Sequence, residues 1–264
     1  MVDPEALRRL AISIAEEAAA LLRDGLGRVR TDVRTKSTGT DMVTEMDRAA
    51  EALIVARLTE ARPDDGMLGE EGTDTVGTTG VRWVFDPLDG TTNYLYELPG
   101  FSVSIAAELD GTTVAGVVHD VVRDECFSAV AGAGATRDGM PISPSGETEL
   151  GLSLVATGFS YDPARRTKQA AVLTEVIPQV RDIRRFGAAA VDLCSVACGR
   201  VDGYYERGLA PWDLAAGSLI AREAGAVVSG FDGGPPTGEG AFAATPAIAE
   251  ALLSLVTAAG ARSA

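Results

Sequence analysis

The chain has 264 residues, of which 46% are hydrophobic and 23% charged, and this balance predicts a folded globular protein rather than a disordered one. Its 38 Asp and Glu residues outnumber 23 Lys and Arg residues, which gives a formal net charge of −15. A surface this acidic repels nucleic acid and anionic membranes, so neither is expected as a partner.

The few cysteines and the single histidine further limit the classes of fold and catalytic mechanism that the chain can have. Three cysteines without regular spacing argue against a disulfide-stapled secreted domain. His119 lies in a run of strand-forming residues and is interpreted as a packing residue, so a Ser-His-Asp mechanism has little support. Residues Pro4–Leu22 form a charged amphipathic pattern unlike a signal peptide, and no apolar run reaches the roughly 20 residues that span a bilayer. We therefore expect a cytoplasmic protein.

Hydrophobic periodicity predicts helices and then strands in the first half of the chain. Helices are expected from about Pro4 to Arg23 and from about Thr44 to Thr59. Strands are expected over Arg82–Phe85, Phe101–Leu109, Thr112–Val121 and Glu125–Ala131. Asp110–Gly111 is typical of a tight hairpin turn between two of these strands. Residues 1–146 are therefore predicted to form an α+β subdomain with a largely antiparallel sheet.

The second half, residues 147–264, alternates strands with helices, which favours an α/β subdomain. The expected strands are Leu152–Ala156, Asp182–Arg185 and Gly203–Glu206. The helices that follow them in turn are expected over Arg165–Val176, Ala188–Ala197 and Trp212–Glu223. Because no linker rich in Pro and Ser separates the halves, the two subdomains are expected to pack as one unit.

The segment Trp83–Tyr94, which includes Asp-Pro-Leu-Asp-Gly-Thr-Thr-Asn, is the most informative motif. A hydrophobic strand delivers Asp86 at its tip, and Pro87 is expected to stop the strand there. Asp89 then turns back beside Asp86, and two carboxylates suit a hard cation such as Mg²⁺. Residues Gly90–Thr92 begin a predicted helix, whose free N–H groups suit a phosphate.

Each of these acids also has an ordinary structural interpretation. Asp86 and Asp89 could simply cap a turn and a helix, because Asp is common at both places. Asp213, two residues after Pro211, fits the chemistry of a helix start. A third acidic segment, the glycine-flanked turn Leu68–Gly72, lies just upstream of the first pair and strengthens the metal interpretation.

Taken together, the motifs closely resemble the inositol monophosphatase family, over about residues 5–260. The resemblance is carried by Leu68–Gly72, Trp83–Tyr94, Arg184–Glu206, Pro211–Gly217 and Lys36–Asp47, the last of which includes Asp-Met-Val-Thr-Glu-Met-Asp. It implies a layered α-β-α-β-α sugar-phosphatase fold, which combines α+β and α/β features. It also implies a homodimer and inhibition by lithium.

The resemblance assigns roles to individual residues. It implies that two or three Mg²⁺ ions are held by Glu70, Asp86, the Leu88 carbonyl, Asp89 and Asp213. Thr91 and Asp47 resemble the pair that orients the attacking water, and Glu70 also supports a third ion. The implied substrate-binding residues are Asp89, Gly90, Thr91, Arg185, Gly187, Ala189, Glu206 and Asp213.

The activity implied is hydrolysis of inositol monophosphate, a small phosphorylated polyol, by metal-activated water. Fructose-1,6-bisphosphatase, histidinol-phosphate phosphatase and 3′-phosphoadenosine nucleotidase share the metal motifs and are alternatives within the superfamily. A regulatory binding protein that retains the fold is the alternative from another class. Ala188 and Ala210 differ from the residues common in relatives, and both changes fall on the substrate side.

Overall fold

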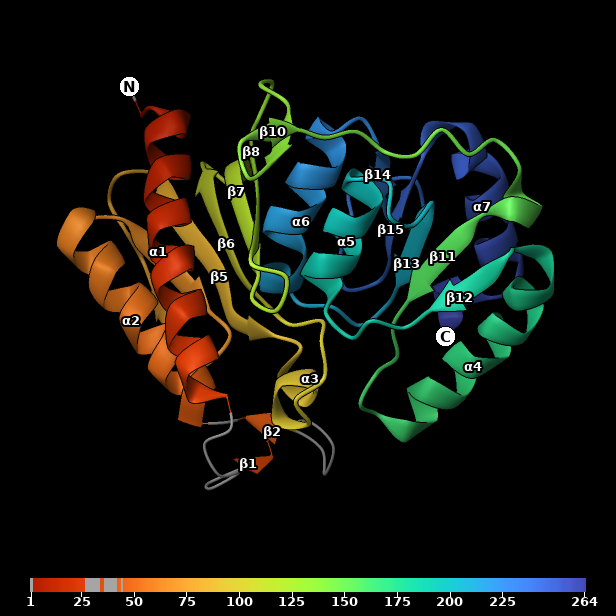
Figure 1. The fold of residues 1–264 in the computed structure, drawn as a ribbon, viewed down its shortest axis with the longest axis horizontal. Helices are drawn as coiled ribbons and strands as arrows, with labels where there is room; N and C mark the ends of the chain where they lie inside the picture. The colour runs from red at the N-terminus through yellow and green to blue at the C-terminus, as the bar shows by residue number, and fades with distance from the viewer. Residues whose placement is uncertain (1, 27–33, 36–41, 44) are drawn as a thin grey trace.

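The computed structural model describes residues 2–26, 34–35, 42–43 and 45–264, so most of the Lys36–Asp47 motif lies outside the described residues. Figure 1 shows alternating layers of helices and sheets. Helices α1 (Pro4–Gly25) and α2 (Glu45–Ala61) cover one face of a large sheet. Helices α5 (Ala189–Ala197) and α6 (Pro211–Glu223) lie between that sheet and a smaller one. Helices α4 (Pro163–Val176) and α7 (Pro246–Ala258) cover the outer face of the small sheet, which completes the predicted α-β-α-β-α arrangement.

The large sheet has eight strands in the order β10-β9-β8-β7-β6-β5-β3-β4. Every neighbouring pair is antiparallel except β3 and β5, which confirms the largely antiparallel sheet. Asp110 and Gly111 have φ values of 48° and 80°, as the predicted hairpin requires. The strands are β3 (Gly66–Gly69), β4 (Asp74–Thr75), β5 (Val81–Asp89), β6 (Ser102–Leu109), β7 (Thr112–Asp120), β8 (Glu125–Val130), β9 (Ala135–Arg137) and β10 (Met140–Pro141).

The small sheet has five strands in the order β12-β11-β13-β15-β14. Strand β11 is parallel to β12 and β13, as strand–helix alternation predicted, whereas β15 is antiparallel to β13 and β14. The elements of this half are β11 (Leu154–Thr157), α4 (Pro163–Val176), β12 (Asp182–Arg184), β13 (Gly203–Glu206), β14 (Val227–Ser229), β15 (Ala241–Ala244) and α7 (Pro246–Ala258). A separate two-stranded ribbon pairs β1 (Arg34–Thr35) with β2 (Met42–Val43).

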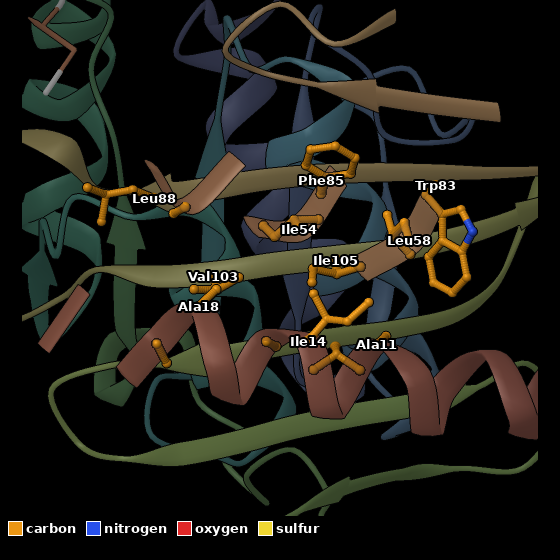
Figure 2. Packing of buried hydrophobic residues seen from close by; sticks show 14 of the residues in the cluster. Ala11, Ile14, Ala18, Ile54, Leu58, Trp83, Phe85, Leu88, Val103 and Ile105 are labelled. Carbon is orange, nitrogen blue, oxygen red and sulfur yellow. The ribbon is translucent and has the colours of Figure 1, made fainter. Parts of the chain in front are cut away.

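Helix α1 shows how the outer layer forms. Asp3 precedes the helix and its side chain accepts a hydrogen bond from the Glu5 N–H at 3.0 Å, while Pro4 occupies the first helical position. Apolar residues then recur at helical spacing and face the sheet. Figure 2 shows this core, to which four elements contribute Ala11, Ile14, Ala18, Ile54, Leu58, Trp83, Phe85, Leu88, Val103 and Ile105.

The central layer depends on close contact between α6 and β7. A Cβ atom on Gly116 would lie only 3.0 Å from the Cα atom of Ala216, so the helix approaches the sheet where glycine leaves room. This contact fixes α6, which carries Asp213 in its first turn, against the sheet that contains β5. Among the helices that the structure describes, none is both long and apolar enough to cross a bilayer.

Candidate functional site

Strand β5 supplies two of the predicted metal ligands, but not in the expected way. The strand does not stop at Asp86; it continues to Asp89, so the expected termination at Pro87 is wrong. The pairing with β6 shifts register between Asp86 and Asp89, and Pro87 lies in this bulge, where its missing N–H costs no ladder hydrogen bond. The Asp86 carboxylate accepts a hydrogen bond from the Leu88 N–H at 2.9 Å. The bulge thereby bends the strand around the first carboxylate.

Three carboxylates that are far apart in sequence meet beside this bulge. One side-chain oxygen each from Asp86, Asp89 and Asp213 lies within 4.8 Å of the other two. The Asp89 carboxylate accepts from the Ala190 N–H at 2.8 Å, and the Asp213 carboxylate accepts from the Ala210 N–H at 2.7 Å. Main-chain donors from α5 and from the start of α6 therefore orient two of the three acids.

The electrostatics of this cluster favour a bound cation. Burial raises the pKa of Asp86 well above its usual range, and the neighbouring charges of Glu70, Asp89 and Asp213 raise it further. Burial also raises the pKa of Asp89 to about 7 and that of Asp213 well above its ordinary value. Like charges held this close out of water are unfavourable without an opposing charge. A donor set made only of carboxylate oxygens fits a hard divalent cation, which would supply that charge.

Glu70 reaches the cluster from the turn that follows β3. The Glu70 N–H donates to the Phe85 carbonyl of β5 at 3.3 Å, and the Gly69 N–H donates to the Thr73 carbonyl at 2.8 Å. These two bonds place the acidic turn beside the bulge. Glu70 lines the same cleft as Asp86 and Asp89.

Thr91 and Asp47, predicted as a pair, are in contact. Thr91 Oγ1 lies 3.1 Å from Asp47 Oδ1 and 3.2 Å from the Leu88 carbonyl oxygen, and Asp47 is 0% exposed. Thr91 begins the predicted short helix, α3 (Thr91–Leu95), after Gly90 in the left-handed region at φ 93°. A Cβ atom at Gly90 would lie 2.7 Å from the Gly100 carbonyl oxygen, so the turn requires glycine.

A cleft of about 420 Å³ joins the acidic cluster to the residues that were predicted to bind substrate. Asp47 does not line it, because it is buried behind Thr91. The other residues predicted from the sequence all line the cleft: Glu70, Asp86, Leu88, Asp89, Gly90, Thr91, Arg185, Gly187, Ala189, Glu206 and Asp213.

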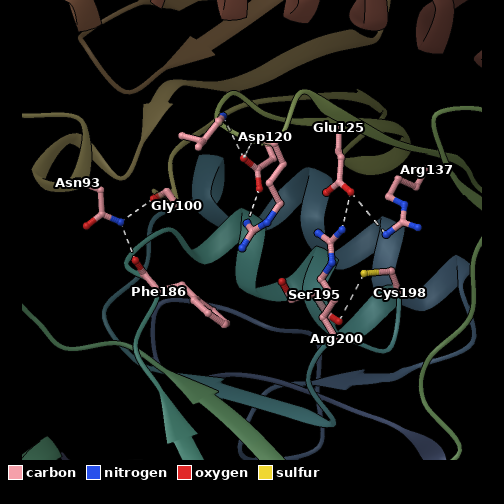
Figure 3. A network of polar contacts seen from close by, with 11 residues as sticks. Asn93, Gly100, Asp120, Glu125, Arg137, Phe186, Ser195, Cys198 and Arg200 are labelled. Atoms are coloured by element: carbon pink, nitrogen blue, oxygen red, sulfur yellow. Dashed lines mark hydrogen bonds and ion pairs between the residues drawn. The ribbon is translucent and has the colours of Figure 1, made fainter. Parts of the chain in front are cut away.

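The side of the cleft that was predicted to bind substrate is organised by Asn93 and Tyr204, whose contacts the sequence alone does not specify. Asn93 donates at 2.6 Å both to the Gly100 carbonyl and to the Phe186 carbonyl, and so ties the loop before α5 to α3 (Figure 3). The buried Tyr204 hydroxyl donates to the Glu206 carboxylate at 2.7 Å. Both positions lie within recognised motifs, but nothing in the sequence indicates which groups they contact.

Asp192 is a further buried acid that the sequence analysis did not single out. It is 1% exposed in the otherwise apolar start of α5. Burial raises its pKa well above the ordinary value, the charges of Glu206 and Asp89 add to this, and Arg185 opposes it. In the sequence, the one feature that could have indicated Asp192 is its position as the single acid in an apolar helical segment.

Comparison with known proteins identifies the family. The model of the inositol monophosphatase family matches residues 3–261. The chain belongs to this family. The inositol-1-monophosphatase of Mycobacterium leprae (strain TN) is 46% identical and covers 96% of this chain and 94% of that protein. A protein named Nus factor SuhB from Pasteurella multocida (strain Pm70) is 42% identical over 94% of each.

A solved structure agrees with this fold. The crystal structure of the extragenic suppressor protein suhB from Bartonella henselae superposes with a TM-score of 0.91 at 37% identity, and covers 95% of this chain and 98% of that chain. The layered fold predicted from the sequence is therefore confirmed.

Proposed function

We propose that this protein is a Mg²⁺-dependent phosphoric monoester hydrolase that converts inositol monophosphate into inositol and phosphate. The observation that carries the proposal is the cluster of Asp86, Asp89 and Asp213, in which the first two are buried and one carboxylate oxygen from each lies within 4.8 Å of the others beside a cleft. The relative named inositol-1-monophosphatase, at 46% identity, supports the same substrate. We place the protein in the cytoplasm and expect a homodimer.

The metal side would hold two or three Mg²⁺ ions through Glu70, Asp86, the Leu88 carbonyl, Asp89 and Asp213. When bound, such ions neutralise phosphate charge, lower the pKa of a water and stabilise the leaving oxygen. The Asp47 carboxylate accepts the hydroxyl hydrogen of Thr91, which leaves Thr91 Oγ1 free to accept a hydrogen bond from the attacking water.

The substrate side would bind the two halves of the monoester. The N–H groups of Gly90 and Thr91 at the start of α3 face the phosphate half in this proposal. Glu206, held by the Tyr204 hydroxyl, would accept hydrogen bonds from polyol hydroxyls, with Arg185 beside it. No protein nucleophile is needed, which is consistent with a cleft that no cysteine or histidine lines among the residues described.

A second candidate function is a regulatory binding role that retains the fold. The relative named Nus factor SuhB, at 42% identity, favours it. The two functions are compatible, because every acid implied in metal binding is present. A net charge of −15 favours a protein over a nucleic acid as the partner.

A substrate panel tests the proposed activity. Phosphate release should be fastest from inositol 1-phosphate, slower from fructose 1,6-bisphosphate, histidinol phosphate and 3′-phosphoadenosine nucleotides, and absent in EDTA. LiCl should inhibit, with KCl as the ionic-strength control, because Li⁺ can enter the carboxylate cluster but supplies less charge than Mg²⁺. A protein that is saturated with Mg²⁺ and releases phosphate from none of these would contradict the assignment.

A further inference from the structure

Helix α2 presents two buried carboxylates on one face, and only the first has been given a role above. Asp47 and Glu51 are four residues apart, so their side chains project from neighbouring turns of the same side of the helix. Asp47 contacts Thr91. Glu51, at 7% exposed, extends instead toward the turn between β3 and β4.

The Glu51 carboxylate is bound inside that turn by three donors. Its Oε2 atom accepts from the Glu71 N–H at 2.8 Å. Its Oε1 atom accepts from the Thr73 N–H at 3.0 Å and from the Thr73 hydroxyl at 2.7 Å. A Cβ atom at Gly69 would lie only 2.6 Å from Glu51 Oε2, so glycine at this position leaves room for the carboxylate.

These contacts fix the main chain on both sides of Glu70. The Glu70 N–H is bonded to the Phe85 carbonyl of β5, which holds the preceding peptide group. The Glu71 N–H is bonded to Glu51, which holds the following one. With both peptide groups anchored, the direction in which the Glu70 side chain leaves the turn is set, and its entry into the cleft depends on Glu51.

We propose that Glu51 is a positioning residue that aims the metal ligand Glu70 into the site, and this inference rests on the proposed metal-dependent function. Partners that orient a metal ligand without touching the ion commonly change metal affinity when mutated. Because Asp47 and Glu51 share one rigid helix, α2 also fixes the separation between the Glu70 turn and Thr91. Movement of α2 would therefore disturb both ends of the site together.

The substitution Glu51→Gln tests this role with little change in shape. The amide replaces one acceptor oxygen with an NH₂ group, which must face an N–H donor of the turn and cannot accept from it. We expect Mn²⁺, used as a probe of the divalent site, to bind about 10- to 100-fold more weakly, measured from free Mn²⁺ by electron paramagnetic resonance. Saturating Mg²⁺ should restore most of the kcat of the variant. The Mg²⁺ concentration needed for half-maximal rate should stay raised.

Two further variants make the result specific. Thr73→Val removes only the hydroxyl donor and should weaken Mn²⁺ binding in the same direction by about 2- to 10-fold, which keeps the test valid if Glu51→Gln does not fold. Glu60→Gln changes a carboxylate of the same helix that is 74% exposed and bonded to Arg57, and should leave Mn²⁺ binding unchanged.

The outcomes separate this inference from the proposed function. If the unmodified protein binds no Mn²⁺, the proposed metal-dependent function fails and the inference fails with it. If the unmodified protein binds Mn²⁺ and folded Glu51→Gln and Thr73→Val bind it equally well, the positioning role alone is wrong. A lower melting temperature without weaker Mn²⁺ binding also contradicts the proposal, because it indicates a purely structural residue.

Discussion

The carboxylates of Asp86, Asp89 and Asp213 carry a cost in stability that hydrogen bonds offset only in part. Each of the three accepts at least one main-chain N–H, yet burial still raises the pKa of all three. Acids whose charges repel one another in a closed site are poor for folding and good for holding a cation. At the scale of single residues, removing one charge should therefore separate stability from activity.

Asp86→Asn should abolish most turnover while making the metal-free protein more stable. We expect kcat with Mg²⁺ to fall by at least about 100-fold, since even partners that do not touch a metal can cost this much when lost. The melting temperature in EDTA should rise, because a neutral amide relieves the repulsion. Asp182→Asn, at an exposed acid, is the control and should show neither effect. A near-normal kcat in Asp86→Asn would refute the metal role.

At the scale of elements, hydrophobic periodicity predicted the helices and strands whose own residues carry a repeating apolar pattern. Long amphipathic segments gave α1 and α2 within a few residues of their observed ends, and the alternating strands β6, β7 and β8 were located almost completely. The short strands β3 and β4 were missed because a glycine-rich acidic segment has no periodicity of its own. Strands β14 and β15 and helix α7 were not assigned, and β5 was ended too early because a bulge that accommodates Pro87 depends on its pairing with β6.

In the candidate site too, features that depend on neighbouring residues in the sequence were predicted, and features that depend on tertiary contacts were not. The local motif placed Asp86 beside Asp89, whereas Asp213 was expected to join them only from the resemblance to the inositol monophosphatase family, and the structure brings the three together. The contacts of Glu51 and Asn93 were not predicted because most of their partners are main-chain groups of distant segments. Such partners leave no mark on residue type, so only the folded structure identifies them.

The packing of α6 on β7 gives a prediction for a whole element. Gly116→Ala places a Cβ atom 3.0 Å from Ala216 Cα, so the helix must move away from the sheet. Overpacking of this kind typically costs about 1–3 kcal/mol, and here it also displaces the first turn that carries Asp213. We expect a lower melting temperature together with weaker Mn²⁺ binding. Gly146→Ala, where a Cβ atom meets nothing within 4 Å, is the matched control, and an equal effect there would exclude the packing explanation.

At the scale of the molecule, the acidic cluster draws on both halves of the chain. Asp86 and Asp89 come from the large sheet, whereas Asp213 comes from α6 in the central layer, whose apolar core includes residues from both sheets. The subdomain boundary near residue 146 stays a prediction. Because the cluster joins the layers, ionisation and metal binding at this one place should affect the stability of the whole protein.

Without Mg²⁺, the stability of the protein should therefore fall as the pH rises, and bound Mg²⁺ should offset that fall. The pKa of Asp89 is raised from 3.8 to about 7, so without metal its favourable contribution is complete below about pH 4 and is lost as the pH rises through 7. Asp86 and Asp213 shift in the same direction. Mg²⁺ binds the ionised carboxylates, so the increase in melting temperature that it causes should grow over the same pH range.

Thermal unfolding between about pH 5 and pH 8, in EDTA and in excess MgCl₂, measures both trends. The melting temperature in EDTA should fall as the pH rises toward 8, and the difference caused by Mg²⁺ should widen until Asp89 is fully ionised. Calorimetry in buffers of different ionisation enthalpy should show protons released when Mg²⁺ binds below about pH 7. Asp89→Asn should reduce both the pH dependence and the proton release. A stabilisation by Mg²⁺ that is constant across this range would show that protonation of the cluster does not oppose metal binding.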